Sequence, residues 1–445
     1  MNTKCDPVEI TPLENWMSQR LRITGRPLPS LVQRYQIARL RETIGYVKAH
    51  SRFYREHLRG MDPEAIQGIG DLAKLPLIGS GILADRPRDL FCVAPCDVSR
   101  IVTLSSSGTT GKPKRVAFTP EDQELIIDFF HHGMMTLARP CDRVLIFLPG
   151  RTEGSVGDLL TKALRRFDCE GIVFGPISDY PRAMKTLSNV APDCAVGIPS
   201  QLLALSRYVR KRIKLRSVLL TTDYVPEAVV ESLGVAWGCR VYNHYGMTEM
   251  GLGGAVECSA REGYHLREAD LLFEIVDPAG RQVKDGEYGE VVFSTLTRKG
   301  MPLIRYRTGD VSRFLPGPCR CGSVLRRMER VSGRLEEPVR LWDGSTLSIT
   351  RLDEILFRNP SIAAYRAELH RGEGCDSLIL TATPVGEKFD ADPVISQLCR
   401  QPHLGDLVRQ GRLRIEVRSG DPAFTTGTAK RSITVSRRAG SSPLN

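Results

Sequence analysis

The sequence predicts an α/β protein with a large N-terminal domain and a small α+β C-terminal domain. Through the middle of the chain, short apolar runs alternate with amphipathic stretches, a pattern typical of βαβ units and a parallel sheet. After about residue 265 the pattern changes to short strands with glycine turns, which indicates a β-rich subdomain. The chain has 445 residues, enough for two domains, and we place residues 1–333 in the large one and 334–445 in the small one.

The individual elements follow from the same periodicity. In the parallel sheet, the expected strands are VLIFL, CAVGI, SVLLTT and RVYNHYG, and the expected helices are LLTKALRRF, PRAMKTL, SQLLALSRYVRKR and PEAVVESL. Near the N-terminus, residues 34–58 carry apolar residues at helical spacing and predict one helix. In the small domain, RLDEILFRNP predicts a helix, and YRAELHR, SLILTAT and LRIEVR predict strands.

A segment rich in hydroxyls and glycine, TLSSSGTTGKPK, spans residues 103–114. Hydroxyls, glycine amides and lysines are donors that suit a polyphosphate, and glycine lets the backbone approach closely. The segment is not a Walker A loop, because Ser106 stands where that loop needs glycine and Pro113 follows Lys112 in place of Ser or Thr. The flanking IVTL and RVAF patterns predict two strands of a hairpin joined by this loop. An ordinary surface turn is the alternative interpretation.

The segment YNHYGMTEMG, residues 242–251, also carries groups that suit a nucleotide. Tyr245 offers an aromatic face for adenine, Thr248 a hydroxyl for the α-phosphate, and Glu249 a hard oxygen ligand for Mg²⁺. Further along, the carboxylate of Asp310 in YRTGD can accept hydrogen bonds from both ribose hydroxyls. The alternatives are a polar loop with a buried tyrosine and a type I turn.

In this order, the segments resemble the motifs of the adenylate-forming superfamily, which includes acyl-CoA synthetases, luciferases and the adenylation domains of peptide synthetases. The resemblance implies that the loop binds the pyrophosphate side of ATP through Ser105, Ser106, Ser107, Gly108, Thr109, Thr110, Gly111 and Lys114. It also implies that Arg334, in VSGRLE, lies near the ribose. Lys430, in TTGTAKR, would bridge the substrate carboxylate and the α-phosphate. A turn with a solvated lysine is the alternative there, since Ala429 stands in place of the usual glycine.

Two segments depart from that superfamily's pattern. The stretch that lies along adenine usually reads Gly-Gly-Glu or Gly-Ala-Glu, whereas residues 219–226 read LLTTDYVP, with Asp223 and Tyr224 in place of the glycine pair. Backbone contacts to adenine remain compatible with this change. The hinge positions after VSGR hold Leu335 and Glu336 instead of the common Asp or Lys, so the pivot residue stays open.

The chain holds 12 cysteines. Its N-terminus has no apolar leader, so we expect a cytoplasmic protein with reduced thiols. Five cysteines stand in apolar surroundings and are expected to pack as small core residues: Cys92, Cys141, Cys169, Cys194 and Cys239. Cys319 and Cys321, in PGPCRCGS, instead form a knuckle that suits tetrahedral Zn²⁺, with Cys258 and His265 as the natural remaining ligands. These four resemble the structural zinc site of phenylacetate–CoA ligase-like proteins, which narrows the resemblance to that branch.

The acid-binding pocket is less well predicted. In that branch, aromatic residues after the phosphate loop line the acyl site, but residues 145–160 offer Phe147 together with Arg151 and Glu153. This composition is compatible with an acid that is polar or larger than phenylacetate. Other candidates for the pocket wall, with a scaffold role as the alternative, are Pro199, Ser200 and His244.

The net charge of +11 is spread along the chain with only a mild cluster at residues 210–214, and no nucleic-acid motif is present. A diffuse positive charge suits anionic ligands such as ATP and coenzyme A. No segment approaches 18 consecutive apolar residues, so we expect no membrane span.

The resemblance implies an enzyme, an ATP-dependent carboxylic acid–CoA ligase that uses Mg²⁺. It would form an acyl-adenylate and then an acyl thioester, releasing pyrophosphate and AMP, while its small domain rotates between the two half-reactions. Its expected partners are a small carboxylic acid, coenzyme A and, as the candidate oligomer, a homodimer. Two alternatives stay open. One is an acid-adenylating enzyme with another acceptor, such as a carrier-protein thiol or an amine. The other is a degenerate nucleotide-binding module without ligase activity.

Overall fold

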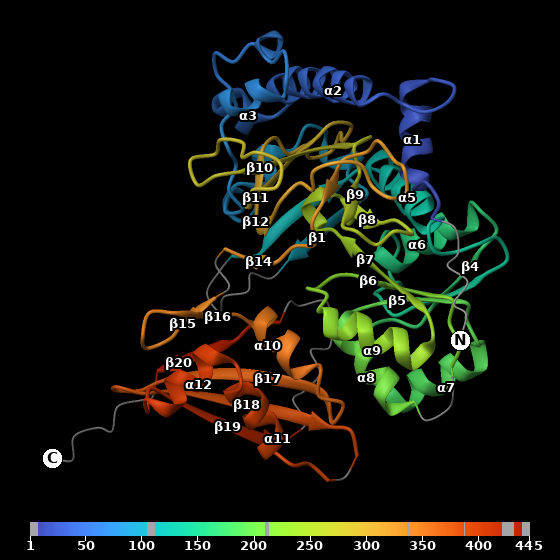
Figure 1. The fold of residues 1–445 in the computed structure, drawn as a ribbon. Helices are drawn as coiled ribbons and strands as arrows, with labels where there is room; N and C mark the ends of the chain where they lie inside the picture. Colours follow the sequence, from blue (N-terminus) through green and yellow to red (C-terminus); the bar gives the residue numbers. More distant parts are fainter. Residues whose placement is uncertain are drawn as a thin grey trace.

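The computed structural model describes residues 8–104, 112–209, 213–335, 338–386, 388–420 and 431–437. Figure 1 shows a large part that contains the N-terminal helices and the main sheets, with a smaller orange and red part packed below it. This α/β arrangement is the predicted fold class. The boundary at residues 333 and 334 stays a prediction.

The largest sheet has eight strands in the order β13-β9-β8-β7-β6-β5-β3-β4. Its strands are β3 (Arg143–Ile146), β4 (Glu170–Val173), β5 (Cys194–Gly197), β6 (Ser217–Leu220), β7 (Arg240–Tyr245), β8 (Ala255–Glu257), β9 (Tyr264–Leu266) and β13 (Arg327–Met328). Strands β3 to β7 pair in parallel, as the alternating pattern predicts, and β8, β9 and β13 extend the sheet antiparallel. All residues of β5 and β6 are buried, because helices cover both faces of this sheet.

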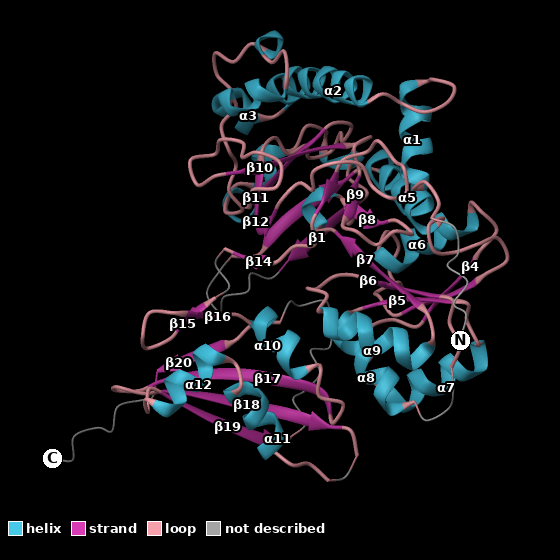
Figure 2. Cartoon of the chain, viewed as in Figure 1, coloured by secondary structure: helices cyan, strands magenta, loops and turns pink. Residues whose placement is uncertain are grey.

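Helices connect the parallel strands and lie over both faces of the sheet (Figure 2). They are α5 (Pro120–Met134), α6 (Val156–Arg165), α7 (Tyr180–Val190), α8 (Pro199–Tyr208) and α9 (Glu227–Trp237). Helix α5 starts with a capping box in which Thr119 and Asp122 satisfy each other's backbone N–H groups. After α9, Gly238 takes the left-handed conformation with φ of 62°, which ends the helix before β7.

The predicted β-rich region is confirmed as an antiparallel four-stranded sheet in the order β10-β11-β12-β14. Its strands are β10 (Leu271–Val276), β11 (Gly289–Thr295), β12 (Tyr306–Ser312) and β14 (Gly333–Arg334). The predicted hairpin is also present, formed by β1 (Arg100–Leu104) and β2 (Lys114–Phe118). Between them, residues 105–111 lie outside the described residues, so the predicted phosphate ligands Ser105 to Gly111 have no structural account.

The N-terminal prediction of one helix over residues 34–58 is wrong in its detail. The structure has α1 (Pro12–Leu21), then α2 (Pro29–His50) and α3 (Arg52–His57). Ser51 interrupts the helix because it takes an extended conformation and its hydroxyl accepts a hydrogen bond from the Tyr54 N–H, capping α3. The link to the hairpin contains four 3₁₀ turns and the short α4: η1 (Pro63–Ala65), η2 (Ile69–Lys74), α4 (Ile82–Asp85), η3 (Pro87–Leu90) and η4 (Pro95–Asp97).

The smaller part is built around a mixed sheet in the order β19-β18-β17-β20. Its elements are β15 (Val339–Arg340), β16 (Thr346–Leu347), α10 (Ile349–Leu356), β17 (Ile362–Arg371), β18 (Asp376–Pro384), α11 (Asp392–Cys399), α12 (Pro402–Arg409), β19 (Leu413–Ser419) and β20 (Thr434–Arg437). One apolar core joins this part to the large one, since Leu203 and Val229 belong to the same cluster as Leu352 and Phe357.

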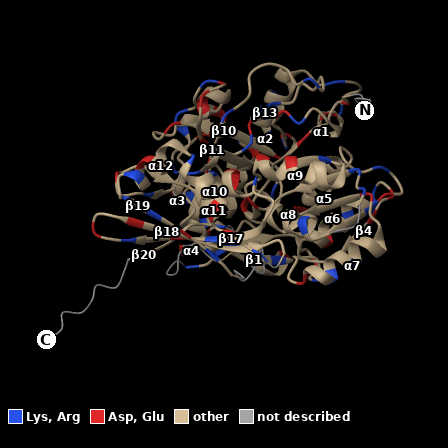
Figure 3. Cartoon of the chain, turned by 60° about the horizontal axis from the view of Figure 1, so that its bottom comes forward, with Lys and Arg blue, Asp and Glu red and all other residues tan. Residues whose placement is uncertain are grey.

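The charged residues are distributed as the sequence predicts. Figure 3 shows Lys and Arg interspersed with Asp and Glu over both parts of the described chain. None of the described helices combines the length and the apolar character needed to cross a bilayer.

Among the cysteines, the expectation for Cys141 is wrong. Cys141 is exposed, because it lies with φ of 71° in the turn before β3, where its side chain points away from the core.

Candidate functional site

Five predicted nucleotide-site residues lie on strands β7, β12 and β14 or in the turn that follows β7. Tyr245 closes β7, and Thr248 and Glu249 begin the 3₁₀ turn that follows it. Asp310 lies on β12 opposite Arg334 on β14, and these two residues are direct partners in the antiparallel register. The structure thus brings together residues that stand 89 positions apart in the sequence, from Tyr245 to Arg334.

Asp310 is the best-connected carboxylate of this group. It is only 2% exposed, and its two oxygens accept separate hydrogen bonds, from the Tyr245 hydroxyl at 2.8 Å and from Arg334 Nε at 3.0 Å. Burial first, and then the charge of Asp310, raise the pKa of Tyr245 well above its usual value, so this hydroxyl keeps its proton. A carboxylate has about four acceptor positions, and two therefore remain for further donors such as ribose hydroxyls.

Glu249 lies beside the hairpin strand that follows the predicted phosphate loop. Its Oε1 accepts a hydrogen bond from the Tyr306 hydroxyl at 3.2 Å and lies 3.8 Å from Lys114 Nζ. The side chain is buried, so a carboxylate here attracts cations more strongly than one in water. The turn that carries it needs Gly246, because a Cβ there would lie 2.3 Å from the Leu252 carbonyl oxygen.

Arg298 is a site residue that the sequence analysis missed. Its guanidinium donates to the carbonyl of Glu249 at 2.7 Å and to the carbonyl of Ala117 at 3.0 Å, and it lies 4.4 Å from the ring centroid of Phe118. It therefore ties β2, which follows the phosphate loop, to the turn that carries Glu249. Burial lowers the pKa of Arg298 from its ordinary value, yet the two carbonyls leave it well hydrogen-bonded. An arginine in TLTRKG gives no signal in the sequence, because its role depends wholly on tertiary contacts.

His244, a candidate for the acid pocket, points to the other side of the same strand end. Its Nδ1 lies 2.8 Å from the Thr221 hydroxyl, while the buried Nε2 has no hydrogen-bond partner among the described residues. The rings of Phe129 and Phe130 lie about it, with centroids at 6.0 and 6.3 Å. Burial, followed by the charge of Arg267, lowers the pKa of His244 to about 4, so the imidazole is neutral at pH 7.

The other acid-pocket candidates are placed differently from one another. Phe147 and Pro199 are buried, and Ser200 is half-buried at the start of α8. Arg151 and Glu153 are exposed, so they cannot line a buried acyl site. The expectation of a more polar acid, which rested on these two charges, loses that support.

The four predicted zinc ligands form one buried cluster. The ligand atoms of Cys258, His265, Cys319 and Cys321 all lie within 4.8 Å of one another. Cys258 Sγ and Cys319 Sγ are 3.6 Å apart, and Cys321 Sγ lies 3.3 Å from His265 Nε2. The two cysteines of the knuckle reach the strands β8 and β9 because β13, shortly after the knuckle, pairs with β9.

The predicted adenylation lysine, Lys430, lies outside the described residues together with the segment 421–430. Arg431, directly after it, is described and forms an ion pair with Asp353 of α10 at 2.5 Å. The attachment point of that segment to the small part is therefore known, and the role of Lys430 stays a prediction.

Comparison with known proteins gives consistent results. A family model described as AMP-binding enzyme matches residues 94–297. Phenylacetate-coenzyme A ligase from Pseudomonas putida is 27% identical over 418 residues, covering 90% of this chain and 92% of that protein. Phenylacetate-coenzyme A ligase from Thermus thermophilus is 29% identical over 355 residues, covering 76% and 78%.

The fold has matches among solved structures. A crystal structure of 2-hydroxyisobutyryl-CoA ligase in the postadenylation state superposes with a TM-score of 0.76 at 20% identity, covering 91% of this chain and 89% of that one. Amide bond synthetase McbA from Marinactinospora thermotolerans superposes with a TM-score of 0.53 at 15% identity, covering 94% and 98%. At these identities the likeness establishes the fold. The chain thus matches the model of AMP-binding enzymes over residues 94–297 and is similar to phenylacetate-coenzyme A ligases over most of its length.

Proposed function

We propose that the chain is an ATP-dependent carboxylic acid–CoA ligase. The observation that carries the proposal is that Tyr245 and Arg334 both donate to Asp310 on β12, while Tyr306 at the start of the same strand donates to Glu249, in a chain related to phenylacetate-coenzyme A ligases over most of its length. A nucleoside triphosphate requires an aromatic ring for its base, a buried carboxylate for its ribose and a second carboxylate for its cation.

In the first half-reaction, a carboxylate oxygen of the acid attacks the α-phosphorus of ATP in line. The new oxygen–phosphorus bond gives the acyl-adenylate, and the bond to the departing pyrophosphate breaks. Asp310 and Arg334 hold the ribose end, and Thr248 donates to the α-phosphate. Lys430 bridges the two reacting groups. No side-chain nucleophile is needed, because the protein acts by positioning the reactants and stabilising their charge.

Glu249 and Lys114 are the residues that would help to neutralise the negative charge of the phosphates. Glu249 is the residue that would hold Mg²⁺, which when bound neutralises phosphate oxygens and so favours departure of pyrophosphate. Lys114 lies at the start of β2, directly after the phosphate loop and 3.8 Å from that carboxylate. The Tyr306 hydroxyl donates to the same Oε1 at 3.2 Å and so fixes the carboxylate.

In the second half-reaction, the thiol sulfur of coenzyme A attacks the acyl carbon of the adenylate. A thioester forms, the bond to AMP breaks, and the thiol proton is released. The adenylate is already activated, so this step depends on access for the thiol and on its orientation.

We further propose that the Cys258, His265, Cys319 and Cys321 cluster holds a structural Zn²⁺. Tetrahedral Zn²⁺ with thiolate and imidazole ligands requires sulfur atoms about 3.8 Å apart and sulfur–nitrogen separations of about 3.6 Å. The measured 3.6 and 3.3 Å are close to both values. All four ligands come from the protein, which is typical of a structural rather than a catalytic site.

The deciding experiment is acid-dependent exchange of labelled pyrophosphate into ATP over a broad acid panel, followed by product analysis with and without coenzyme A. The proposal expects exchange with at least one acid, and a thioester together with AMP when coenzyme A is added. Exchange without a thioester would point to another acceptor, such as a carrier thiol or an amine. If exchange is absent with every acid, and Lys430→Ala leaves ATP binding unchanged, the chain is a nucleotide-binding module and the ligase proposal fails.

A further inference from the structure

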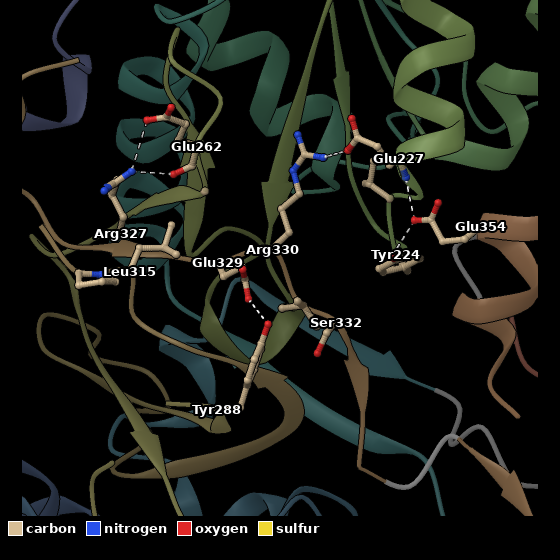
Figure 4. A pocket seen from close by; sticks show the side chains of 14 residues that line it. Tyr224, Glu227, Glu262, Tyr288, Leu315, Arg327, Glu329, Arg330, Ser332 and Glu354 are labelled. Carbon is tan, nitrogen blue, oxygen red and sulfur yellow. Dashed lines mark hydrogen bonds and ion pairs between the residues drawn. The ribbon is translucent and has the colours of Figure 1, made fainter. Parts of the chain in front are cut away.

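A pocket of about 580 Å³ opens where the large and the small parts of the molecule meet. Figure 4 shows residues of both parts around it: Tyr224, Glu227 and Arg330 from the large part, and Glu354 from α10 of the small part. Tyr224 belongs to the segment LLTTDYVP, in which Asp223 and Tyr224 replace the glycine pair of the superfamily. The nucleotide site described above makes no use of this tyrosine.

Glu354 reaches across the junction with three hydrogen bonds. Its Oε1 accepts from the Tyr224 hydroxyl at 2.9 Å and from the Glu227 N–H at 2.8 Å, and its Oε2 lies 3.4 Å from the Ala228 N–H. These two amides begin α9, whose own N-cap is Pro226, a residue with no side-chain acceptor. A carboxylate from the small part thus takes the place of the missing cap, where the helix dipole favours negative charge.

The residue before Glu354 connects the same helix to Arg431, the first described residue after position 430. Asp353 Oδ1 lies 2.5 Å from Arg431 Nη1, and Arg431 Nη2 also donates to the Tyr365 carbonyl at 3.2 Å. Arg431 and Asp353 are both largely buried. Two neighbouring residues of α10 therefore make different contacts. Glu354 binds Tyr224 in the loop after β6, and Asp353 binds Arg431, the residue that follows Lys430.

From this geometry we propose that Glu354 is a positioning residue for adenylation. It fixes the angle at which α10 docks on Tyr224 and α9, while the next residue on the same helix, Asp353, holds Arg431, which follows Lys430 in the sequence. The inference rests on the proposed function, since adenylation is the half-reaction that Lys430 would serve. The tyrosine that replaces glycine at position 224 then has a structural role, because its hydroxyl supplies the docking hydrogen bond to Glu354.

The other contacts across the junction constrain this docking angle less than Glu354 does. The shared apolar core between α8, α9 and α10 is non-directional and tolerates small rotations. Arg358 and Glu231 pair at 3.6 Å, but both are more than half exposed, so this pair contributes little. Arg207 donates to the carbonyls of Phe357 and Ile362, which holds the backbone after α10 but not the helix face that carries Glu354.

The test compares the two half-reactions in Glu354→Ala, Glu354→Gln and Tyr224→Phe. We expect Glu354→Ala to slow acid-dependent pyrophosphate exchange about tenfold, while thioester formation from added acyl-adenylate and coenzyme A changes less than about twofold. Tyr224→Phe is expected to show part of this loss. Glu354→Gln keeps an acceptor oxygen for Tyr224 and is expected to recover part of the exchange rate. Equal losses in both half-reactions, or no loss in either, would overturn the proposal.

A matched control lies in the same pocket. The Tyr288 hydroxyl donates to Glu329 at 2.6 Å, but both residues belong to the large part, so Tyr288→Phe removes a similar hydrogen bond without touching the junction. We expect it to leave both half-reactions unchanged, and a loss equal to that of Tyr224→Phe would contradict the docking role.

Amide hydrogen exchange gives a readout that does not depend on activity. The N–H groups of Glu227 and Ala228 should lose protection in Glu354→Ala and keep it in Tyr288→Phe. If the wild-type chain shows no pyrophosphate exchange with any acid, the ligase function fails. The docking contact is then decided by this protection alone, and unchanged protection in Glu354→Ala refutes it.

Discussion

Individual side chains in the candidate site act in connected pairs. Asp310 receives one hydrogen bond from the strand end that carries Tyr245 and another from the strand that carries Arg334. Glu249 is held in the same way by Tyr306, while Arg298 holds its backbone carbonyl. A buried carboxylate that is fixed by several donors keeps its direction before a ligand arrives, which reduces the reorganisation that binding would require.

At Glu249, the variant Glu249→Gln tests the proposed Mg²⁺ contact. The amide oxygen can still accept from Tyr306, so we expect the free energy of unfolding to change by no more than about 1 kcal/mol. Loss of the anionic ligand should lower the rate of pyrophosphate exchange by about 100-fold and raise the Mg²⁺ concentration required. The measurement is the exchange rate as a function of Mg²⁺. A dependence identical to that of the wild type would exclude Glu249 from cation binding.

His244 gives a prediction for pH. Its pKa falls from 6.5 to about 4 on folding, because burial and Arg267 oppose its charge. The unfolded chain therefore binds the extra proton first, and stability is lost as the pH falls from about 6.5 towards 4. In His244→Gln this part of the pH dependence should disappear. Urea unfolding of both proteins between pH 7 and 4 measures it, and parallel curves would show that the His244 side chain is accessible and unperturbed.

His244 also provides a test of the acid pocket. We expect His244→Ala to change the KM for the acid about tenfold or more and the KM for ATP less than about twofold, because the side chain lies on the side of β7 away from Asp310. Steady-state kinetics with the best acid from the panel provides both constants. An equal effect on both substrates would mean that His244 supports the nucleotide site instead.

The residues of the site were predictable from the sequence to the extent that their chemistry is local. Glu249, Asp310 and Arg334 stand in short motifs whose side chains suit a nucleotide, and the structure brings these motifs close together. Arg298 could not be predicted, because its two acceptors are backbone carbonyls about 50 and 180 residues away. The exposure of Arg151 and Glu153 was not predictable, since a charged pair in the sequence does not indicate which face of a loop it occupies.

At the scale of elements, the cysteine cluster adds a cross-link between parts of the chain that the pairing of β8, β9 and β13 already brings side by side. Cys258 follows β8, His265 lies on β9, and the knuckle with Cys319 and Cys321 lies between β12 and β13. A metal held by all four would fix the end of the main sheet to the strand that carries Asp310. Such a site contributes to folding directly, because the ligands come together only in the native state.

The knuckle is tested by the variant Cys321→Ser, with the exposed Cys141→Ser as the matched control. The wild type and the control should contain about one equivalent of zinc. Cys321→Ser should lose the metal and melt about 5–10 °C lower. Elemental analysis and thermal melts measure both quantities. Less than about half an equivalent in freshly prepared wild type would rule out the proposed structural zinc.

Regular elements were predicted well where the apolar period was strong, as in the parallel strands and the β1–β2 hairpin. The break between α2 and α3 was not, because the apolar spacing continues through Ser51 and only its capping hydrogen bond to Tyr54 ends the helix. The docking of α10 on α9 was equally hidden, because Glu354 and Tyr224 are 130 residues apart.

The molecule as a whole combines two parts through a junction that is both apolar and hydrogen-bonded. Nucleotide binding would involve residues of β7, β12 and β14, which lie close to this junction (Figure 1). A ligand that binds only the folded state stabilises the whole molecule by an amount that grows with the logarithm of the ligand's excess over the dissociation constant.

Asp310→Asn tests this coupling at the level of the molecule. Asparagine keeps an acceptor for Tyr245, so we expect the melting temperature without ligand to stay within a few degrees of the wild type. In the wild type, ATP at 100 times its Kd should add about 2.7 kcal/mol of stability, and this gain should be largely lost in Asp310→Asn. Thermal melts with and without ATP and Mg²⁺ measure it. An undiminished shift in the variant would remove Asp310 from the nucleotide site.

The contact between α1 and the segment at the cysteine knuckle joins residues that are synthesised far apart in time. The Val324 N–H donates to Glu14 at 2.7 Å across 310 residues, and Arg26 donates to the Gly322 carbonyl. At about 5–20 residues per second, a ribosome needs about 15–60 s to make the chain between these partners. Throughout that interval Glu14 and Arg26 lack these two partners, whereas Trp16 can already pack against Phe129 and His132 of α5, which are made much earlier. Helix α1 is thus fixed in two stages of synthesis, first by apolar packing on α5 and only later by the hydrogen bond between Glu14 and Val324.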